Sequence, residues 1–183
     1  MTLFIDTHFS DVYIVLYENG AVIKEKLVKD ERQNSKVIMP TIKKILGKKI
    51  PNDILVVNGP GSFTGVRVGV TIAKGLAQNL NIPIRCISSL ECLASSVEDS
   101  EKIVAFSDNN GYYVGIFDEN ISLIGNYEYI NNNEFFEFSK LYEVKINPNY
   151  NIKKIIDYGL SKEPINYHLV NPVYIKKIDV EKW

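Results

Sequence analysis

The sequence predicts an α/β protein with two lobes, the second one small. Three observations support this. Three strand-like segments precede a helix, and a further strand and a long helix follow before residue 83. Pro83 then marks a boundary, which divides the chain into a first lobe at residues 1–83 and a smaller lobe at residues 84–183. The chain has 183 residues, of which 45% are hydrophobic, enough to build two cores.

The first lobe opens with an antiparallel meander. Short apolar runs predict strands over residues 3–5, 12–17 and 21–28. Asn19-Gly20 supplies the positive φ that a tight hairpin requires. A helix is expected over residues 35–46, with Gly47 as its stop signal and Pro40 bending it.

The central segment of the chain is a strand, a glycine loop and a long helix. The strand is expected at residues 53–57 and the helix at residues 63–80, with Ser62 or Thr64 as N-cap. Gly59 and Gly61 allow positive φ and a close backbone approach, while Pro60 ends the strand. The loop and the helix start therefore form a concavity of free N–H groups, suited to an anion or to another stretch of backbone.

This order of elements is that of one lobe of the actin-like ATPase (ASKHA, ribonuclease H-like) fold. Enzymes of that fold place carboxylates at strand ends near a metal-bound phosphate, and Asp6 and Asp108 stand at comparable positions. The alternative is that each is a turn residue that satisfies its own backbone. The phosphate-loop-like candidates are Asp6, Thr7, Gly59, Gly61, Ser62, Thr64 and Gly65.

The helix at 63–80 carries more apolar surface than one sheet can cover. Its small residues permit close approach of another helix, and the preceding helix offers Met39, an adaptable contact residue. We therefore expect these two helices to form a partner surface; the alternative is a helix buried on two sides within its own chain. The expected partner-binding residues are Met39, Ile42, Val66, Gly69, Val70, Ala73 and Ala77.

The second lobe is predicted from shorter signals. A strand at 84–87 and a helix capped by Ser89 open it. Strands follow at 102–107 and 112–117, around the turn Asp108-Asn109-Asn110-Gly111, and another is expected at 121–130. A short helix is expected at 131–139, and a second at 151–158 that Gly159 ends.

The residue patterns of self-sufficient enzymes are missing from the sequence. His8 and His168 have no metal-ligand spacing, and Cys86 and Cys92 form no Cys-x-x-Cys pair. The glycine loop lacks the Lys of a P-loop, Ser62 lacks a nucleophile elbow, and the loosened dinucleotide fingerprint has no acidic residue after its next strand. We therefore expect no catalytic residue, no metal ligand and no tightly bound cofactor, with ATP and Mg²⁺ at most weakly held or bound only at the level of a complex.

Composition sets limits on the environment and partners of the chain. The net charge of −1 provides no global basic field for nucleic acid. Two cysteines and no disulfide framework fit a reducing compartment. Neither a membrane-spanning run nor a signal peptide is seen, so a cytoplasmic location is expected.

The central segment also carries a family resemblance. Gly59-Pro60-Gly61-Ser62-Phe63-Thr64-Gly65-Val66-Arg67-Val68-Gly69, continued by Ala73-Lys74-Gly75-Leu76-Ala77, resembles the signature of the TsaB (YeaZ) family. Phe4-Ile5-Asp6-Thr7, Ile82-Pro83-Ile84, Ser88-Ser89-Leu90-Glu91-Cys92-Leu93-Ala94 and, weakly, Pro172-Val173-Tyr174-Ile175-Lys176 extend it. At the first helix, Asn34 replaces the usual His and Lys36 the usual acidic residue. Residues 121–171 show little resemblance.

The resemblance implies a function that the residues alone do not. It implies a non-catalytic scaffold in the complex that makes threonylcarbamoyl-adenosine (t6A) next to the anticodon of tRNA. Its partners would be the catalytic homologue TsaD, the ATPase TsaE and tRNA as substrate of the complex, with a homodimer when TsaD is absent. The competing hypothesis is a stand-alone actin-like phosphotransferase or hydrolase that uses Asp6 and Asp108.

Overall fold

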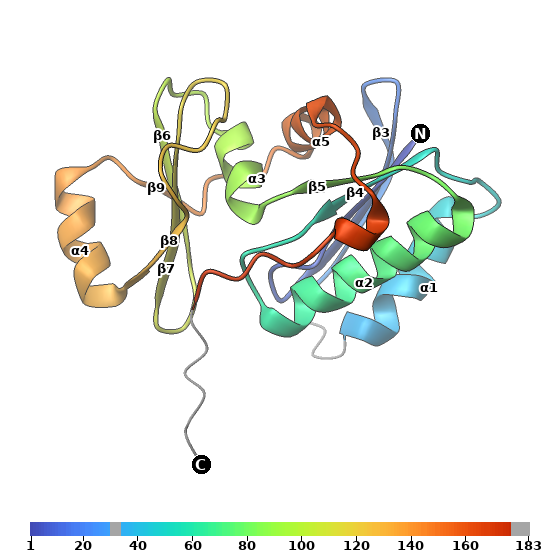
Figure 1. The fold of residues 1–183 in the computed structure, drawn as a ribbon, viewed down its shortest axis with the longest axis horizontal. Coiled ribbons are helices and arrows are strands. Elements are labelled where there is room, and N and C mark those ends of the chain that lie inside the picture. Colours follow the sequence, from blue (N-terminus) through green and yellow to red (C-terminus); the bar gives the residue numbers. More distant parts are fainter. Residues whose placement is uncertain (30–33, 177–183) are drawn as a thin grey trace, which may run out of the picture.

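The computed structural model describes residues 1–29 and 34–176, without the side chains at positions 34 and 35. The first part of the chain forms five strands and two helices (Figure 1): β1 (Thr2–Asp6), β2 (Val12–Glu18), β3 (Ala21–Val28), α1 (Asn34–Leu46), β4 (Asp53–Val57), α2 (Phe63–Leu80) and β5 (Ile84–Ile87). The rest forms α3 (Ser89–Ser96), β6 (Lys102–Ser107), β7 (Gly111–Phe117), β8 (Glu128–Asn131), α4 (Asn132–Leu141), β9 (Lys145–Ile146), α5 (Ile152–Ser161) and the 3₁₀ helix η1 (Tyr167–Leu169).

The first sheet has the strand order β3-β2-β1-β4-β5. Strand β1 is antiparallel to β2 and parallel to β4, and β4 is parallel to β5. Helices α1 and α2 cover one face of this sheet, and α5 covers the other with Ile155 and Ile156. Alternate residues of the central strands point to the two faces, so every central strand is buried on both sides. This topology is the actin-like ATPase, ribonuclease H-like arrangement that the sequence predicts.

The second sheet is smaller, with the strand order β8-β7-β6-β9. Helix α3 packs on one face of it through Leu90, Leu93 and Ala94, and α4 packs on the other through Phe135. Figure 1 shows α3 on the side of this sheet that faces the first lobe and α4 on the outer side.

The predicted division between residues 83 and 84 cuts through the first sheet. Strand β5 pairs with β4 in parallel, from Ile54↔Ile84 to Val57↔Ile87. Helix α5, although late in the sequence, also returns to the first lobe and packs against β4. The chain thus passes to the second lobe after β5 and returns before α5. The first sheet needs both segments, because β5 is the parallel neighbour of β4 and α5 covers the second face of the sheet.

Three predictions in the second half are wrong in detail. Ser88, not Ser89, is the N-cap of α3. The strand expected at 121–130 is confined to β8; the segment before it is irregular apart from one bridge between Phe117 and Leu123. Gly159 does not end the helix, since α5 runs to Ser161. A Cβ at Gly159 would lie 2.4 Å from Leu55 Cδ2, so this glycine lets the helix approach the sheet closely.

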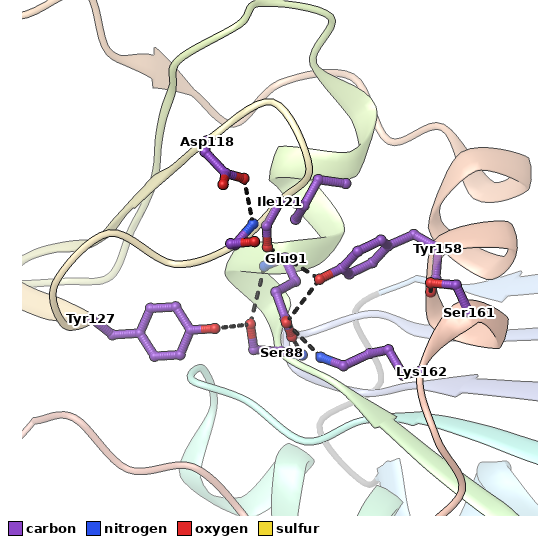
Figure 2. Close-up of polar contacts among 9 residues, drawn as sticks. Ser88, Glu91, Asp118, Ile121, Tyr127, Tyr158, Ser161 and Lys162 are labelled. Carbon is purple, nitrogen blue, oxygen red and sulfur yellow. Dashed lines mark hydrogen bonds and ion pairs between the residues drawn. The ribbon is translucent and has the colours of Figure 1, made fainter.

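A network of half-buried polar side chains joins the lobes at the start of α3 (Figure 2). Glu91 completes a capping box with Ser88, and its Oε1 receives hydrogen bonds from Lys162 Nζ at 2.5 Å and from the Tyr158 hydroxyl at 3.3 Å. The Ser88 and Tyr127 hydroxyls lie 2.8 Å apart. Because these groups come from α3, from the end of α5 and from the segment before β8, they fix the second lobe against the first.

Candidate functional site

The glycine loop between β4 and α2 has the local structure that the sequence predicts. Ser62 is the N-cap of α2, and its hydroxyl accepts a hydrogen bond from the Gly65 N–H at 3.2 Å. Asn81 ends the helix with a left-handed φ of 53°. Thr64, the alternative cap, is exposed.

The concavity of this loop is filled by the turn that follows β1. The Ser62 N–H donates to the His8 carbonyl at 2.7 Å, and the Thr7 hydroxyl donates to the Gly65 carbonyl at 2.8 Å. A Cβ at Gly61 would lie 2.4 Å from the His8 carbonyl oxygen, and one at Gly65 would lie 2.2 Å from that of Thr7. Of the two occupants that the sequence allows, an anion or another backbone, the structure shows backbone.

Two further segments close the loop from other sides. The Ser89 hydroxyl donates to the Pro60 carbonyl at 2.6 Å, and the Ser89 N–H donates to the Gly59 carbonyl at 2.9 Å. The returning C-terminal segment binds through the Val173 N–H, which donates to the Asn58 carbonyl at 2.7 Å. The phosphate-loop-like candidates thus gather in one place, but the Ser62 N–H and the Thr7 hydroxyl already bind other groups of the chain.

Asp6 is buried and fully engaged, which the sequence did not indicate. Its Oδ1 lies 2.6 Å from His8 Nδ1 and accepts the His8 N–H at 3.0 Å, and its Oδ2 accepts the Tyr150 hydroxyl at 2.6 Å. Burial raises the pKa of this carboxyl, but electrostatic attraction to His8 and hydrogen bonds from His8 and Tyr150 lower the pKa below its ordinary value. Tyr150 is 144 residues away, so no local pattern could have revealed it.

A groove of about 810 Å³ opens beside Asp6, between the first sheet and the segment that precedes α5. Its walls carry aromatic, apolar and charged side chains: Asp6, Phe9, Asp11, Tyr13, Glu25, Lys26, Leu27, Leu93, Asn147, Pro148 and Tyr150. No residue of the glycine loop lines it. The groove has the size of a ligand site, but it lies away from the N–H groups that would hold a phosphate.

Asp108 is a turn residue. Its Oδ1 accepts the backbone N–H groups of Asn110 and Gly111 at 2.8 and 3.1 Å and the Tyr129 hydroxyl at 2.6 Å, while Oδ2 lies 3.2 Å from Lys176 Nζ. Burial raises the pKa of Asp108, but these partners lower it more. Asp6 and Asp108 share no hydrogen-bond partner, and within residues 1–29 and 34–176 no three His, Cys, Asp or Glu side chains gather as metal ligands.

Most residues expected to bind a partner are buried against their own sheet. Val66, Val70, Ala73, Ala77 and Ile42 are each at most 2% exposed and belong to the core beneath α1 and α2. Gly69 lies over Thr7, whose Oγ1 would be 2.2 Å from an added Cβ. The prediction is therefore wrong for these six residues: the small side chains bring α2 close to β1 and its turn, not to another helix.

The outer faces of α1 and α2 remain open. Met39 is 44% exposed, and it lines a shallow groove of about 350 Å³ between the two helices. The other residues of this groove are Arg67, Val68, Thr71 and Ile72. This outer groove is the exposed, partly apolar surface of α1 and α2.

The fold and the filled loop define a class: a protein with the actin-like ATPase arrangement whose glycine loop is occupied by its own backbone. A family model described as "TsaD: tRNA N6-adenosine threonylcarbamoyltransferase" matches residues 23–178. The chain belongs to the family that this model describes. Its sequence also places it among the TsaB proteins.

Curated relatives and a solved structure agree with that assignment. The chain is 37% identical over 123 residues to the tRNA threonylcarbamoyladenosine biosynthesis protein TsaB of Bacillus subtilis, covering 63% of this chain and 54% of that protein. It is 35% identical over 102 residues to TsaB of Haemophilus influenzae, covering 50% and 43%. The chain thus spans about half the length of the curated relatives it matches. The structure of YeaZ from Pseudomonas aeruginosa has the same fold, with a TM-score of 0.77, 18% identity and coverage of 95% and 99%.

Two remaining predictions concern the cysteines and the membrane. Cys92 is buried and Cys86 is half-buried, and burial raises the pKa of the Cys86 thiol to about 11, so both are packing residues. Within the part of the chain that the structure describes, no helix has the length and apolarity to cross a membrane.

Proposed function

We propose that this protein is a non-catalytic subunit in the biosynthesis of threonylcarbamoyl-adenosine in tRNA, and that it supports a TsaD-like catalytic homologue. One observation carries the non-catalytic part: the backbone of Thr7 and His8 fills the concavity of the glycine loop, so the loop is not open to a phosphate. Membership of the TsaB family supports the pathway. ATP with Mg²⁺ is expected to bind weakly, and calorimetry that gave sub-micromolar affinity would contradict this.

The outer groove of α1 and α2 is the proposed contact with TsaD. It combines exposed Met39 with half-buried Val68 and Ile72, an apolar strip between polar Arg67 and Thr71. A partner that brought two helices of its own would form a four-helix contact, burying about 1,600 Å² in total. Without TsaD, the same groove would pair with itself in a two-fold homodimer. A TsaE-like ATPase and tRNA would join at the level of the complex.

The test uses Met39→Glu, which places a charge in the groove without touching the core. Sedimentation with TsaD should show at least about tenfold weaker association, because the charge would be buried without a partner. Ile124→Glu is the matched control, since Ile124 is 50% exposed in the second lobe. Circular dichroism should show both variants folded. If Met39→Glu binds TsaD as the control does, the groove is not the interface.

A further inference from the structure

The edge strand β3 and helix α1 carry a concentration of lysines that the proposed scaffold role does not use. Residues 21–49 contain nine Lys or Arg against three Asp or Glu, a balance of +6 in a chain whose net charge is −1. The rest of the chain therefore carries −7. The near-neutral total, which argued against a global basic field, conceals a strongly basic region.

The fold gathers part of this charge around one groove. Lys24 and Lys26 pair with Leu16 and Ile14 of β2, whose side chains lie in the core beneath α1. Residues paired across strands share a face, so both lysines stand on the α1 side of the sheet. There a groove of about 510 Å³ is lined by Lys24, Glu25, Lys26, Pro40, Thr41, Lys44 and Ile45; we call it the basic groove.

The lysines of the basic groove have no acidic partner among the residues that the structure describes. Within residues 1–29 and 34–176, Lys24, Lys26 and Lys44 form no ion pair, and all three are exposed. The one acidic residue of β3, Glu25, pairs with Val15 and accepts a hydrogen bond from Tyr13, on the opposite face of the sheet. Glu25 also lines the basic groove, but its carboxylate is hydrogen-bonded to the Tyr13 hydroxyl.

Lysines in the second half of the chain differ in that many of them form ion pairs. Six are paired with acidic side chains of the described residues: Lys140, Lys145, Lys153, Lys154, Lys162 and Lys176. Edge-strand lysines discourage pairing with another chain, which accounts for β3 taken alone. It does not account for Lys44, which comes from α1 and meets the two strand lysines at the same groove.

We propose that the basic groove binds the sugar-phosphate backbone of RNA, an inference that rests on the proposed role in tRNA modification. Lys24 and Lys26 are two residues apart on a strand, so their side chains emerge about 6.6 Å from each other and can meet neighbouring phosphates. Lysine is a point-charge donor to phosphate, and Thr41 adds a hydroxyl donor. A concave groove admits a strand of polyanion but not the plane of a membrane.

RNA binding at the basic groove is compatible with the proposed TsaD contact. The basic groove and the outer groove of α1 and α2 share no residue: Thr41 and Lys44 line the first, and Met39 lines the second. Helix α1 thus separates a polar, cationic side from an apolar side. The subunit can then hold a protein with one side and the RNA backbone with the other.

The experiment measures the affinity of the full chain for an unmodified tRNA transcript as salt is varied. In the triple variant Lys24→Gln, Lys26→Gln, Lys44→Gln, we expect at least about tenfold weaker binding at low salt and a slope of log K against log salt reduced by about 2 to 3. The matched control removes the same charge from ion-paired lysines: Lys140→Gln, Lys145→Gln and Lys153→Gln. The control should bind within about twofold of wild type.

Several outcomes would overturn the proposal. Equal weakening of both triple variants would show that only net charge matters. Lysine-dependent binding to phosphatidylserine vesicles, with tRNA binding unchanged, would identify a membrane surface instead. Sedimentation with TsaD separates the two proposals. If the complex with TsaD forms but the triple variant binds tRNA as tightly as wild type does, the RNA-binding proposal is wrong and the scaffold proposal stands. Lysine-dependent tRNA binding without any TsaD complex supports the groove and contradicts the scaffold role.

Discussion

Helix α2 has two apolar faces, and the protein uses them in opposite ways. The inner face, with Val66, Gly69 and Ala73, is buried against β1, β4 and the turn after β1. The outer face, with Val68 and Ile72, is half-buried beside exposed Met39. Gly69 and Ala73 lie on the inner face beside branched Val66, at positions where the sheet and its turn leave little room. Small side chains on a helix thus mark where its own fold approaches closely, and need not mark a partner.

The largest effect is expected when a charge enters the inner face. Ala73→Glu should abolish the fold, because Ala73 is fully buried among aliphatic side chains and an unpaired carboxylate there costs several kcal/mol. Circular dichroism and thermal melting measure it. Thr71→Glu, on the exposed side of the same helix, should remain folded; equal melting of the two variants would show that the inner face is not buried.

A smaller loss of stability is expected from a substitution in the glycine loop. Gly61→Val adds a branched side chain whose Cβ would lie 2.4 Å from the His8 carbonyl oxygen, so the turn after β1 must move. We expect a loss of about 1–3 kcal/mol of unfolding free energy in urea titration. A variant that unfolds at the wild-type midpoint would mean that the loop does not rest on this turn.

The Asp6 carboxylate stabilises the turn after β1, and its contribution to stability depends on pH. The pKa of Asp6 in the folded chain is lowered from 3.8, so its carboxylate contributes stability above that pH, and the contribution is lost as pH falls through the folded pKa. Asp6→Asn removes this contribution. The difference in unfolding free energy between wild type and Asp6→Asn should be present at pH 7 and shrink below pH 3.8. A difference that is independent of pH would contradict the assignment.

The smallest effect compares one substitution at two glycines of α2. Gly75→Ala should stabilise the protein by about 1 kcal/mol, since alanine is the better helix former and an added Cβ meets nothing within 4 Å. Gly69→Ala should destabilise it, because the same methyl group would lie 2.2 Å from Thr7 Oγ1. Melting temperatures that moved in the same direction would remove the distinction between the two faces.

The sequence by itself determined the local elements of the first lobe. The loop residues and Ser62 define where α2 begins, and the hairpin at Asn19-Gly20 has the predicted positive φ at both residues. Asp108 is the turn residue that one of the two interpretations expected. These features depend on residues within a few positions of each other, so a short window of sequence contains their cause.

Tertiary structure decided everything that needs a distant neighbour. The helical periodicity of α2 is a local property of the sequence. Which of its apolar faces meets the sheet depends on Thr7 and β1, and the prediction assigned the face with the small residues to a partner instead of to the sheet. Only the folded chain brings Tyr150 to Asp6, Leu55 to Gly159, and Lys44 to the lysines of β3. Helical and strand periodicity shows that a face exists, whereas what covers the face is a matter of packing between segments far apart in the chain.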